Sequence, residues 1–395
     1  MRRNKTRFLK IFLIVAATAL IAFAAFFFFI LPPIVADSQN PVAQKPPFQV
    51  SENARNLHQK LLIADLHADS LLWNRDLNVK NESGHVDFPR MRAGNIALQF
   101  FTVVTKSPRN LNIEQNSPDT DNIFWLALAQ RQPLGNLSSL LKRAVYQAEK
   151  LHEYADKERG KFIIIKTKRD LAEFLQRRNN EPDLIAGVLG IEGAHALDGK
   201  PENVDVLFDA GFRMMSPSHF FDSEMGGSAH GVERGGLTEA GREMIRRMER
   251  RGMLVDVAHA SARTIDDVLQ MAKRPVVVSH TGVRGTCDNN RNLTDEQLRR
   301  IAQTGGVVGI GFWDTAVCGE DASAIAKAIR YAANTVGTNA VALGSDFDGA
   351  VKTPFDVSGM ALITEALLRE NFSEDEITQI MGGNVLRLLG ENLPE

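Results

Sequence analysis

Six short apolar runs in this chain each lead into a histidine or an acidic residue. The residues placed in this way are Asp65, His67 and Asp69 after the first run, and then Glu192, His219, His259, His280 and Asp346. Short apolar runs bounded by polar residues are typical of strands that are buried on both faces of a parallel sheet. In a closed parallel barrel, the active site lies at the carboxyl ends of the strands. The pattern therefore predicts a barrel whose catalytic groups gather at one end.

Nine candidate strands alternate with amphipathic segments from about residue 53 onward. They are expected at residues 62–65, 96–104, 162–165, 186–191, 212–216, 254–258, 276–279, 307–312 and 341–344. This alternation is typical of α/β proteins, and 395 residues with 44% hydrophobic content suffice for one large domain. We expect a distorted (β/α)8 barrel of the TIM type. Because such a barrel has eight strands, residues 162–165 are expected to form an accessory strand or none.

The first 50 residues divide by composition into three parts. Residues 1–10 are a basic tail with five Lys or Arg side chains and no acidic one, and residues 11–31 are apolar except for Thr18. About 20 apolar residues span a bilayer as a helix, and basic residues before the span predict a cytoplasmic N-terminus. We expect a transmembrane anchor, a linker at residues 32–50 and the barrel domain at residues 51–395. A cleaved signal peptide is the alternative, and under both interpretations the body is extracytoplasmic, either periplasmic or extracellular.

The charge and cysteine content narrow the function classes. Residues 11–395 carry 41 basic and 48 acidic side chains, and a mildly acidic body without a basic stripe argues against nucleic-acid binding. The chain has two cysteines, Cys287 and Cys318. In an oxidising compartment they could pair, whereas two free buried thiols are the alternative, and the spacing does not decide between them.

The residues at the strand ends suggest a metal site. His67 and Asp69 are one residue apart, so on an extended strand both side chains point to the same side. Glu192 ends a very apolar strand, where a buried carboxylate needs a compensating arginine or metal ion. His259 and His280 end two successive strands. Three imidazoles and several carboxylates suit a divalent metal of the zinc type, and we expect two ions that share ligands.

Asp346 is the first acidic residue after the last clear strand. From there a carboxylate is well placed to act as general base and general acid towards a metal-bound water. Asp348 is expected to shape the turn before Gly349 or to cap the next helix.

The remaining histidines are assigned no catalytic role. His58, His85 and His152 lie in polar sequence contexts and are expected to be exposed. His195 is expected to support the strand that carries Glu192, and His230 to lie in a loop above the barrel mouth.

In combination these motifs resemble the membrane dipeptidase (renal dipeptidase) family of zinc metallopeptidases, within the amidohydrolase-like barrels. They are D-x-H-x-D at residues 65–69, G-x-E-G-x-H at 190–195, V-D-x-A-H-x-S at 255–261, S-H at 279–280 with R-N eleven residues on, and G-x-D-F-D-G at 344–349. The resemblance covers nearly all of the body.

The resemblance implies a role for each matching residue. His67 and Asp69 would bind one zinc ion, His259 and His280 the other, and Glu192 would bridge both. His219 would polarise the substrate carbonyl and stabilise the oxyanion, Arg291 would hold the terminal carboxylate of the substrate, and Asp346 would be the acid/base. The resemblance also implies a disulfide between Cys287 and Cys318.

The function implied by the resemblance is that of a membrane-anchored binuclear zinc dipeptidase. A hydroxide that bridges two zinc ions would attack the peptide carbonyl of a dipeptide with a free C-terminal carboxylate. Two other functions stay open: an amidohydrolase acting on N-acyl amino acids or lactones, and a non-catalytic exported binding protein. Arg291 distinguishes the first of these, because its role requires a free carboxylate next to the scissile bond. The side-chain preference and a homodimer are left open.

Overall fold

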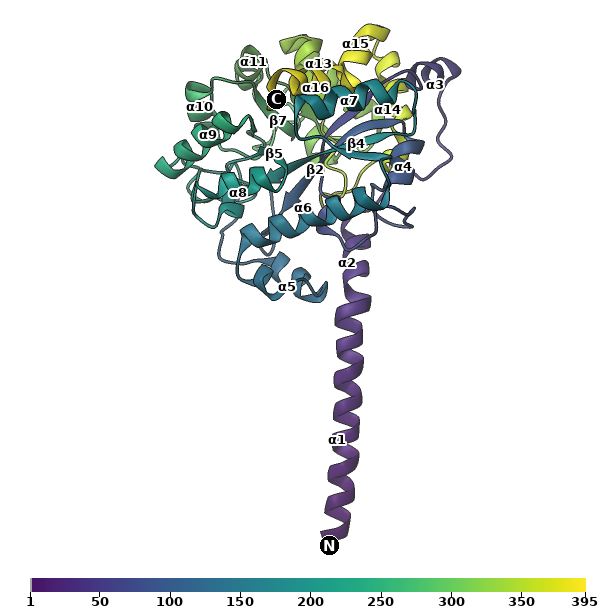
Figure 1. Ribbon diagram of the computed structural model, residues 1–395, viewed down its shortest axis with the longest axis vertical. Coiled ribbons are helices and arrows are strands. Elements are labelled where there is room, and N and C mark those ends of the chain that lie inside the picture. Colours follow the sequence, from purple (N-terminus) through teal and green to yellow (C-terminus); the bar gives the residue numbers. More distant parts are fainter. Residues whose placement is uncertain (1) are drawn as a thin grey trace.

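The computed structural model describes residues 2–395, and its body is a closed parallel barrel with helices outside it (Figure 1). The barrel strands are β1 (Ile63–Ala68), β2 (Ile96–Val104), β4 (Ile185–Glu192), β5 (Phe212–Met215), β6 (Leu254–Asp256), β7 (Val276–Thr281), β8 (Val308–Ile310) and β9 (Val341–Leu343). Neighbours pair in parallel around the sheet, and pairing of β2 with β4 closes it. The predicted (β/α)8 fold is confirmed.

Of the strands in residues 2–395, the one outside the closed barrel is β3 (Phe162–Ile164). It pairs with the start of β4, where Phe162 lies opposite Ile185, whereas β5 pairs with the later part of β4, where Phe212 lies opposite Leu189. Because β2 occupies the other edge of β4 along most of its length, β3 and β5 share one edge. Residues 162–165 therefore provide the expected accessory strand, and this sharing distorts the barrel.

The outer layer consists of helices that follow or precede the strands. They are α3 (Glu52–His58), α4 (Phe88–Ala93), α5 (Asn122–Ala129), α6 (Leu140–Lys157), α7 (Lys168–Arg178), α8 (Asn203–Asp209), α9 (Glu239–Arg251), α10 (Ala262–Met271), α11 (Asp295–Gln303), α12 (Asp314–Val317), α13 (Ala322–Val336), α14 (Ala361–Arg369), α15 (Glu374–Thr378) and α16 (Asn384–Asn392). Short helical turns are η2 (Ser70–Leu72), η3 (Leu134–Leu137), η4 (Ala194–Leu197), η5 (Thr338–Ala340), η6 (Val357–Gly359) and η7 (Gln379–Gly383).

Strand alternation places the site inside the barrel. Ala186 and Val188 of β4 belong to a buried cluster that also contains Phe100 of β2 and Met214 of β5. Side chains two positions apart on a strand face the same side, so Glu192 faces the same interior as these residues. Apolar side chains of β4 fill the barrel interior, and the polar side chain of Glu192 follows them at the carboxyl end of this strand.

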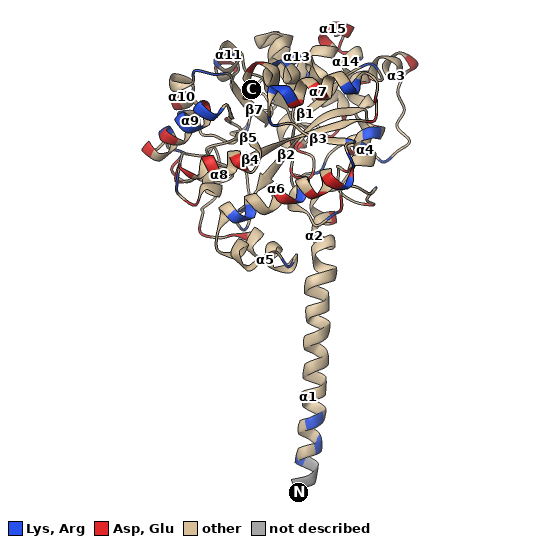
Figure 2. Ribbon diagram, viewed as in Figure 1, with Lys and Arg blue, Asp and Glu red and all other residues tan. Residues whose placement is uncertain are grey.

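The N-terminal helix continues further than its composition suggests. α1 (Arg2–Ala25), the π-helical segment η1 (Phe26–Ile30) and α2 (Leu31–Gln39) follow one another without a break (Figure 1). Among the described residues, this is the one helix that is long enough and apolar enough to cross a membrane. Its first part, α1, carries no charged side chain after the basic first turns (Figure 2). Pro32 and Pro33 do not end the helix, because proline is tolerated in the first turn of a helical segment such as α2.

Residues 32–50 do not form a free spacer between the helix and the barrel. Ala36 is buried in a small apolar cluster with Trp73 of the barrel. The Asn40 side chain accepts a hydrogen bond from Ala350 N at 3.0 Å, and Ala43 N donates to Thr353 O at 2.9 Å. The helix is therefore attached to the barrel next to the loop that follows β9.

The expected exposure of two histidines is wrong, and of the two roles expected for Asp348 the helix cap is not found. His58 and His85 are buried, not exposed. Asp348 does not cap a helix: it pairs with Arg75 at 2.7 Å and accepts hydrogen bonds from Ser70 Oγ and His85 N. Despite complete burial, these charges and hydrogen bonds lower the pKa of Asp348 to about 2. The residue thus fastens the loop after β1 to the loop after β9.

Candidate active site

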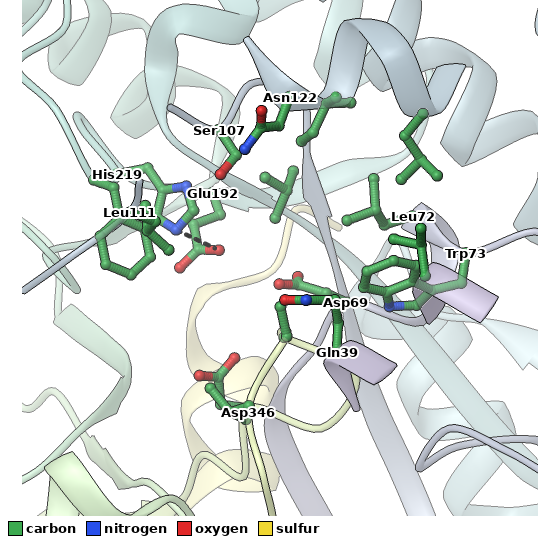
Figure 3. A pocket seen from close by; sticks show the side chains of 18 of the residues that line it. Gln39, Asp69, Leu72, Trp73, Ser107, Leu111, Asn122, Glu192, His219 and Asp346 are labelled. Atoms are coloured by element: carbon green, nitrogen blue, oxygen red, sulfur yellow. Dashed lines mark ion pairs between the residues drawn. The ribbon is translucent and has the colours of Figure 1, made fainter. Parts of the chain in front are cut away.

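All eight residues singled out for chemistry lie at one end of the barrel. His67 and His280 lie on β1 and β7, Glu192 ends β4, and Asp69 directly follows β1. His219, His259, Arg291 and Asp346 lie in the loops after β5, β6, β7 and β9. All eight are buried, and all except His67 line a cavity of about 670 Å³ (Figure 3).

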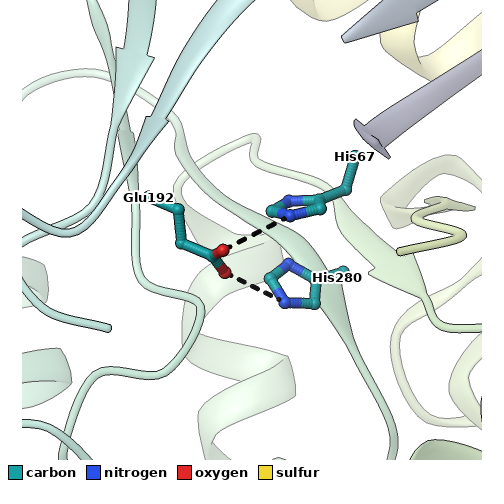
Figure 4. Close-up of side chains that lie close together, drawn as sticks. All are labelled: His67, Glu192 and His280. Carbon is teal, nitrogen blue, oxygen red and sulfur yellow. Dashed lines mark ion pairs between the residues drawn. The ribbon is translucent and has the colours of Figure 1, made fainter. Parts of the chain in front are cut away.

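Glu192 lies at the centre, and its two oxygens face different imidazoles. Oε1 is 2.9 Å from His259 Nε2 and 3.3 Å from His280 Nε2. Oε2 is 3.2 Å from His219 Nε2 and 3.7 Å from His67 Nε2. Figure 4 shows this carboxylate between His67 and His280. The two oxygens of one carboxylate therefore each lie near a different pair of imidazole nitrogens.

Two further carboxylates approach His67, one directly after the same strand and one from the loop after β9. Its Nε2 is 3.5 Å from Asp69 Oδ1 and 3.8 Å from Asp346 Oδ1. The Asp69 Oδ1 also accepts a hydrogen bond of 2.6 Å from Thr102 Oγ1 on β2. Asp69 is thus held from both sides.

The backbone is strained where two of these residues project into the cavity. His259 and Asp346 both have φ of 60°, in the left-handed region that non-glycine residues rarely adopt. Such a conformation costs roughly 1–3 kcal/mol and persists only where the surroundings impose it. Gly193 after Glu192 has φ of 94°, and a Cβ there would lie 2.3 Å from the His195 ring. The strained turns aim the side chains that the site needs.

Burial and neighbouring charges shift the acidities in the cluster. Burial raises the pKa of Glu192 to about 7 although the His67 charge opposes it, and burial raises the pKa of Asp346 well above its usual value. Burial lowers the pKa of His259 and of His280 well below the usual range. Burial also disfavours charge on His67, but the carboxylates of Glu192 and Asp69 outweigh it and raise the pKa of His67. Carboxylates gathered this closely favour a compensating cation.

The side chains present fit a divalent metal. Among residues 2–395, three overlapping groups could hold an ion: His67, Glu192 and His280; Glu192, His219 and His259; and His67, Asp69 and Asp346. The buried atoms His67 Nε2 and Glu192 Oε1 have no hydrogen-bond partner among the described residues. His259 Nε2 and His280 Nε2 face each other at 3.0 Å, an arrangement that needs a proton or a cation between them. Imidazole and carboxylate together suit zinc.

A serine and an aspartate that were given no role from the sequence orient two of the histidines. Ser279 Oγ donates to Asp256 Oδ2 at 2.6 Å, which leaves its lone pairs for His67 Nδ1 at 3.1 Å and His280 Nδ1 at 3.0 Å. Both imidazoles then carry their proton on Nδ1 and keep Nε2 free. Partners of this kind fix the tautomer of metal-ligating histidines. The sequence signal was their position within V-D-x-A-H and S-H, next to two expected ligands.

Arg291 reaches the cavity from the loop after β7. Its guanidinium donates to His280 O at 2.8 Å and lies 5.6 Å from the centre of the Trp313 ring. Burial lowers the pKa of Arg291 to about 10. Asp288, an acid that could have braced Arg291, instead lies 4.0 Å from Arg284.

Two other histidines, His195 and His230, are buried near the site. His195 is buried against Phe221, and neither ring nitrogen has a hydrogen-bond partner among residues 2–395, so it does not bond to Glu192. His230 is buried beside Phe220, and its Nδ1 lies 2.6 Å from Ile113 O. Cys287 and Cys318 form a disulfide, as the resemblance implied.

Comparison with known proteins identifies the family. The family model for membrane dipeptidase (Peptidase family M19) matches residues 51–393. The chain belongs to the membrane dipeptidase family. It is a metallopeptidase-type hydrolase, as the motifs suggested.

A curated relative agrees with this assignment, and two solved structures share the fold. The dipeptidase aclJ of Aspergillus oryzae is 29% identical over 352 residues, which cover 83% of this chain and 78% of the relative. A metallopeptidase from Rhodobacter sphaeroides, solved with a phosphinate mimic of the dipeptide L-Ala-D-Ala, has a TM-score of 0.69 at 24% identity over 84% of this chain and 99% of its own. The probable dipeptidase PvdM from Pseudomonas aeruginosa has a TM-score of 0.71 at 19% identity over 87% and 98% of the two chains. The two structures support the barrel fold of this membrane dipeptidase family member.

The shared contact of Ser279 with two imidazoles gives a prediction about metal affinity. Ser279→Ala should weaken zinc binding about 10- to 100-fold, the range typical for loss of a group that orients a metal ligand. The measurement is a competitive zinc titration with a chromogenic chelator.

The matched control is Thr364→Val, which removes another buried hydroxyl bonded to an imidazole, that of His58 at 2.9 Å. This control should keep wild-type zinc affinity. Equal affinity in Ser279→Ala and wild type would show that the serine does not orient the histidines.

Proposed function

We propose that this protein is a membrane-anchored binuclear zinc dipeptidase that hydrolyses dipeptides with a free C-terminal carboxylate. The observation that carries the proposal is Glu192, whose Oε1 faces His259 and His280 while its Oε2 faces His67 and His219. A carboxylate shared in this way would suit a ligand common to two divalent ions.

In this proposal the ligands divide between two zinc ions. His67 and Asp69 would hold one, His259 and His280 would hold the other, and Glu192 would be shared between them. Bound there, zinc would supply Lewis-acid chemistry that acidifies water and polarises the peptide carbonyl.

Three further side chains act on the substrate. Arg291 binds its C-terminal carboxylate through paired N–H···O bonds, because a guanidinium matches that geometry. His219, whose pKa burial lowers well below its usual range, is neutral and keeps one N–H donor for the oxyanion. Asp346 takes the proton of the attacking water on its carboxylate and delivers it to the leaving amine nitrogen. The C–N bond breaks, and an amino acid leaves from each side.

The N-terminal helix is proposed as an uncleaved anchor with the body extracytoplasmic. Its last turns pack against the barrel at Ala36 and hydrogen-bond to it at Asn40, contacts that a signal peptide cleaved near Asp37 would lose in part. The disulfide between Cys287 and Cys318 supports an oxidising compartment outside the cytoplasm.

Exchanging single carboxylates separates the bridging role from the acid/base role. Glu192→Gln should lower zinc stoichiometry as well as rate, because the change removes the charge that balances two dications. Asp346→Asn should keep both ions and lower kcat by about 10²- to 10⁴-fold, the typical contribution of general acid–base catalysis. Metal analysis of each purified variant beside steady-state kinetics makes the test. Metal loss in Asp346→Asn with retention in Glu192→Gln would exchange the two roles.

The proposed carboxylate contact of Arg291 predicts substrate length and charge. Dipeptides should be cut, tripeptides should be poor substrates, and C-terminally amidated dipeptides should be nearly inert. Arg291→Lys should lower kcat/KM on dipeptides by more than about fivefold. A fivefold loss corresponds to roughly 1 kcal/mol, which is the upper end of what an exposed ion pair contributes.

Arg284→Lys is the matched control, because Arg284 lies on the same loop but does not line the cavity. It should behave as wild type. Equal kcat/KM for amidated and free dipeptides would instead favour an amidohydrolase on N-acyl amino acids or lactones.

The anchor predicts how the full-length protein fractionates. The protein should remain with membranes after carbonate extraction, because a spanning helix of residues 11–31 resists release. N-terminal sequencing of the mature protein decides the alternative, since a mature terminus near Asp37 is the result of signal-peptide cleavage.

A further inference from the structure

One segment of the body is almost free of charge. Residues 122–141 form α5, η3 and the start of α6, and Arg131 is their one charged side chain. In the chain as a whole 24% of the residues are charged, so a stretch of this length would be expected to carry about five charges. Figure 2 shows α5 without a basic or an acidic residue. A surface segment of this composition is typical of contact with an apolar partner.

Two apolar side chains of this segment face outwards. Leu134 of η3 is 80% exposed, the highest fraction of any large apolar side chain among residues 2–395, and Trp125 of α5 is 49% exposed. Trp73 and Trp313 are instead buried. Because α5 packs against η3, the two exposed side chains lie on neighbouring elements. The segment therefore presents an apolar surface that the described residues leave uncovered.

Contacts with the N-terminal helix fix the level of this segment. η1 (Phe26–Ile30) belongs to the apolar run at residues 11–31 and packs against α5. The Arg131 guanidinium lies 4.4 Å from the centre of the Phe29 ring. At a helical rise of about 1.5 Å per residue, η1 lies within about 8 Å of the end of that run. In Figure 1, α5 accordingly lies beside the upper end of the long helix, on the side of the body from which the helix projects.

A lipid surface is the partner that this level provides. Under the proposed anchoring, residues 11–31 span the bilayer core, so η1 and α5 lie at its outer boundary. Tryptophan is enriched at that boundary because its ring is apolar and its N–H is polar. An arginine there keeps its stem on apolar surface while its guanidinium reaches the lipid phosphates. Arg131 suits this arrangement, since it is exposed and pairs with no carboxylate in the part of the chain that the structure describes.

We propose that residues 122–141 form a second contact with the membrane, separate from the spanning helix. Trp125 and Leu134 lie in the lipid interface, and Arg131 faces the lipid phosphates. This proposal rests on the proposed anchor and not on the identity of the substrate. A single spanning helix can tilt in the bilayer and carry the docked body with it, whereas a second contact holds the body at one angle to the bilayer.

Tryptophan fluorescence tests the contact directly. The full-length protein is reconstituted in phosphatidylcholine vesicles whose acyl chains carry bromine either near the headgroup or near the methyl end. Bromine quenches only tryptophans that lie close to it, so the difference between wild type and Trp125→Phe isolates the signal of Trp125. This signal should lose about half of its intensity or more, and more with the shallow than with the deep bromine, because tryptophan prefers the interface. Trp125 should also be shielded from aqueous iodide.

Two further reporters make the test independent of Trp125. Leu134→Trp and Thr378→Trp are each introduced into the Trp125→Phe background. Thr378 is the matched control, because it is also exposed but lies on α15, at the end of the body away from the long helix (Figure 1). Bromine should quench the reporter at the first position and leave the reporter at the second unchanged.

The outcomes separate the contact from the proposed anchor. Protein that stays with the vesicles after carbonate extraction, but shows no quenching of Trp125 and equal quenching of the two reporters, would overturn the contact and leave the anchor intact. Shielding of Trp125 from bromine as well as from iodide would mean that another protein surface covers it, and would also overturn the contact. Release of the protein by carbonate would overturn the anchor and with it this proposal.

Discussion

The buried carboxylate of Glu192 sets the chemistry of the whole site. It ends a strand whose interior neighbours are apolar, so its charge has little solvent to stabilise it. Four imidazoles from four different loops or strands approach its two oxygens within 3.7 Å. A buried carboxylate surrounded by imidazoles, with two more carboxylates close by, is stable where cations balance it. The barrel makes this possible because every parallel strand ends at the same rim.

The position of the strand ends does not by itself orient the candidate ligands. Two local features of the structure do so. Left-handed backbone at His259 and Asp346 turns these side chains into the cavity at a conformational cost. The Ser279 hydroxyl, held by Asp256, touches the Nδ1 atoms of His67 and His280 and couples the two halves of the proposed metal pair. Burial of the apolar core stabilises the fold, and this stabilisation offsets the cost of the strained backbone.

The fold class, and the convergence of the candidate residues at one rim, could be predicted from the sequence because both depend on local patterns. Most of the candidate residues lie at or within a few residues of the end of an apolar strand, so the apolar run and the residue singled out for chemistry are close in sequence. The burial of His85 could not be read, because its surroundings are polar in sequence and its partner Asp348 lies 263 residues away. The accessory role of β3 depends on which edge of β4 it shares, and the docking of Ala36 against Trp73 depends on tertiary contacts that composition does not reveal.

The docking of the N-terminal helix against the barrel bears on how a membrane anchor would hold this enzyme. Residues 32–50, as a flexible chain, would span on the order of 25 Å and let the cavity face any direction. Fixing them costs conformational entropy, which the apolar contacts of Ala36 and the hydrogen bonds of Asn40 and Ala43 offset. Under the proposed anchoring, the fixed geometry holds the cavity mouth at one height and one orientation above the bilayer. Because the same helix lines the cavity, the segment that would position the enzyme above the bilayer also forms part of the cavity wall.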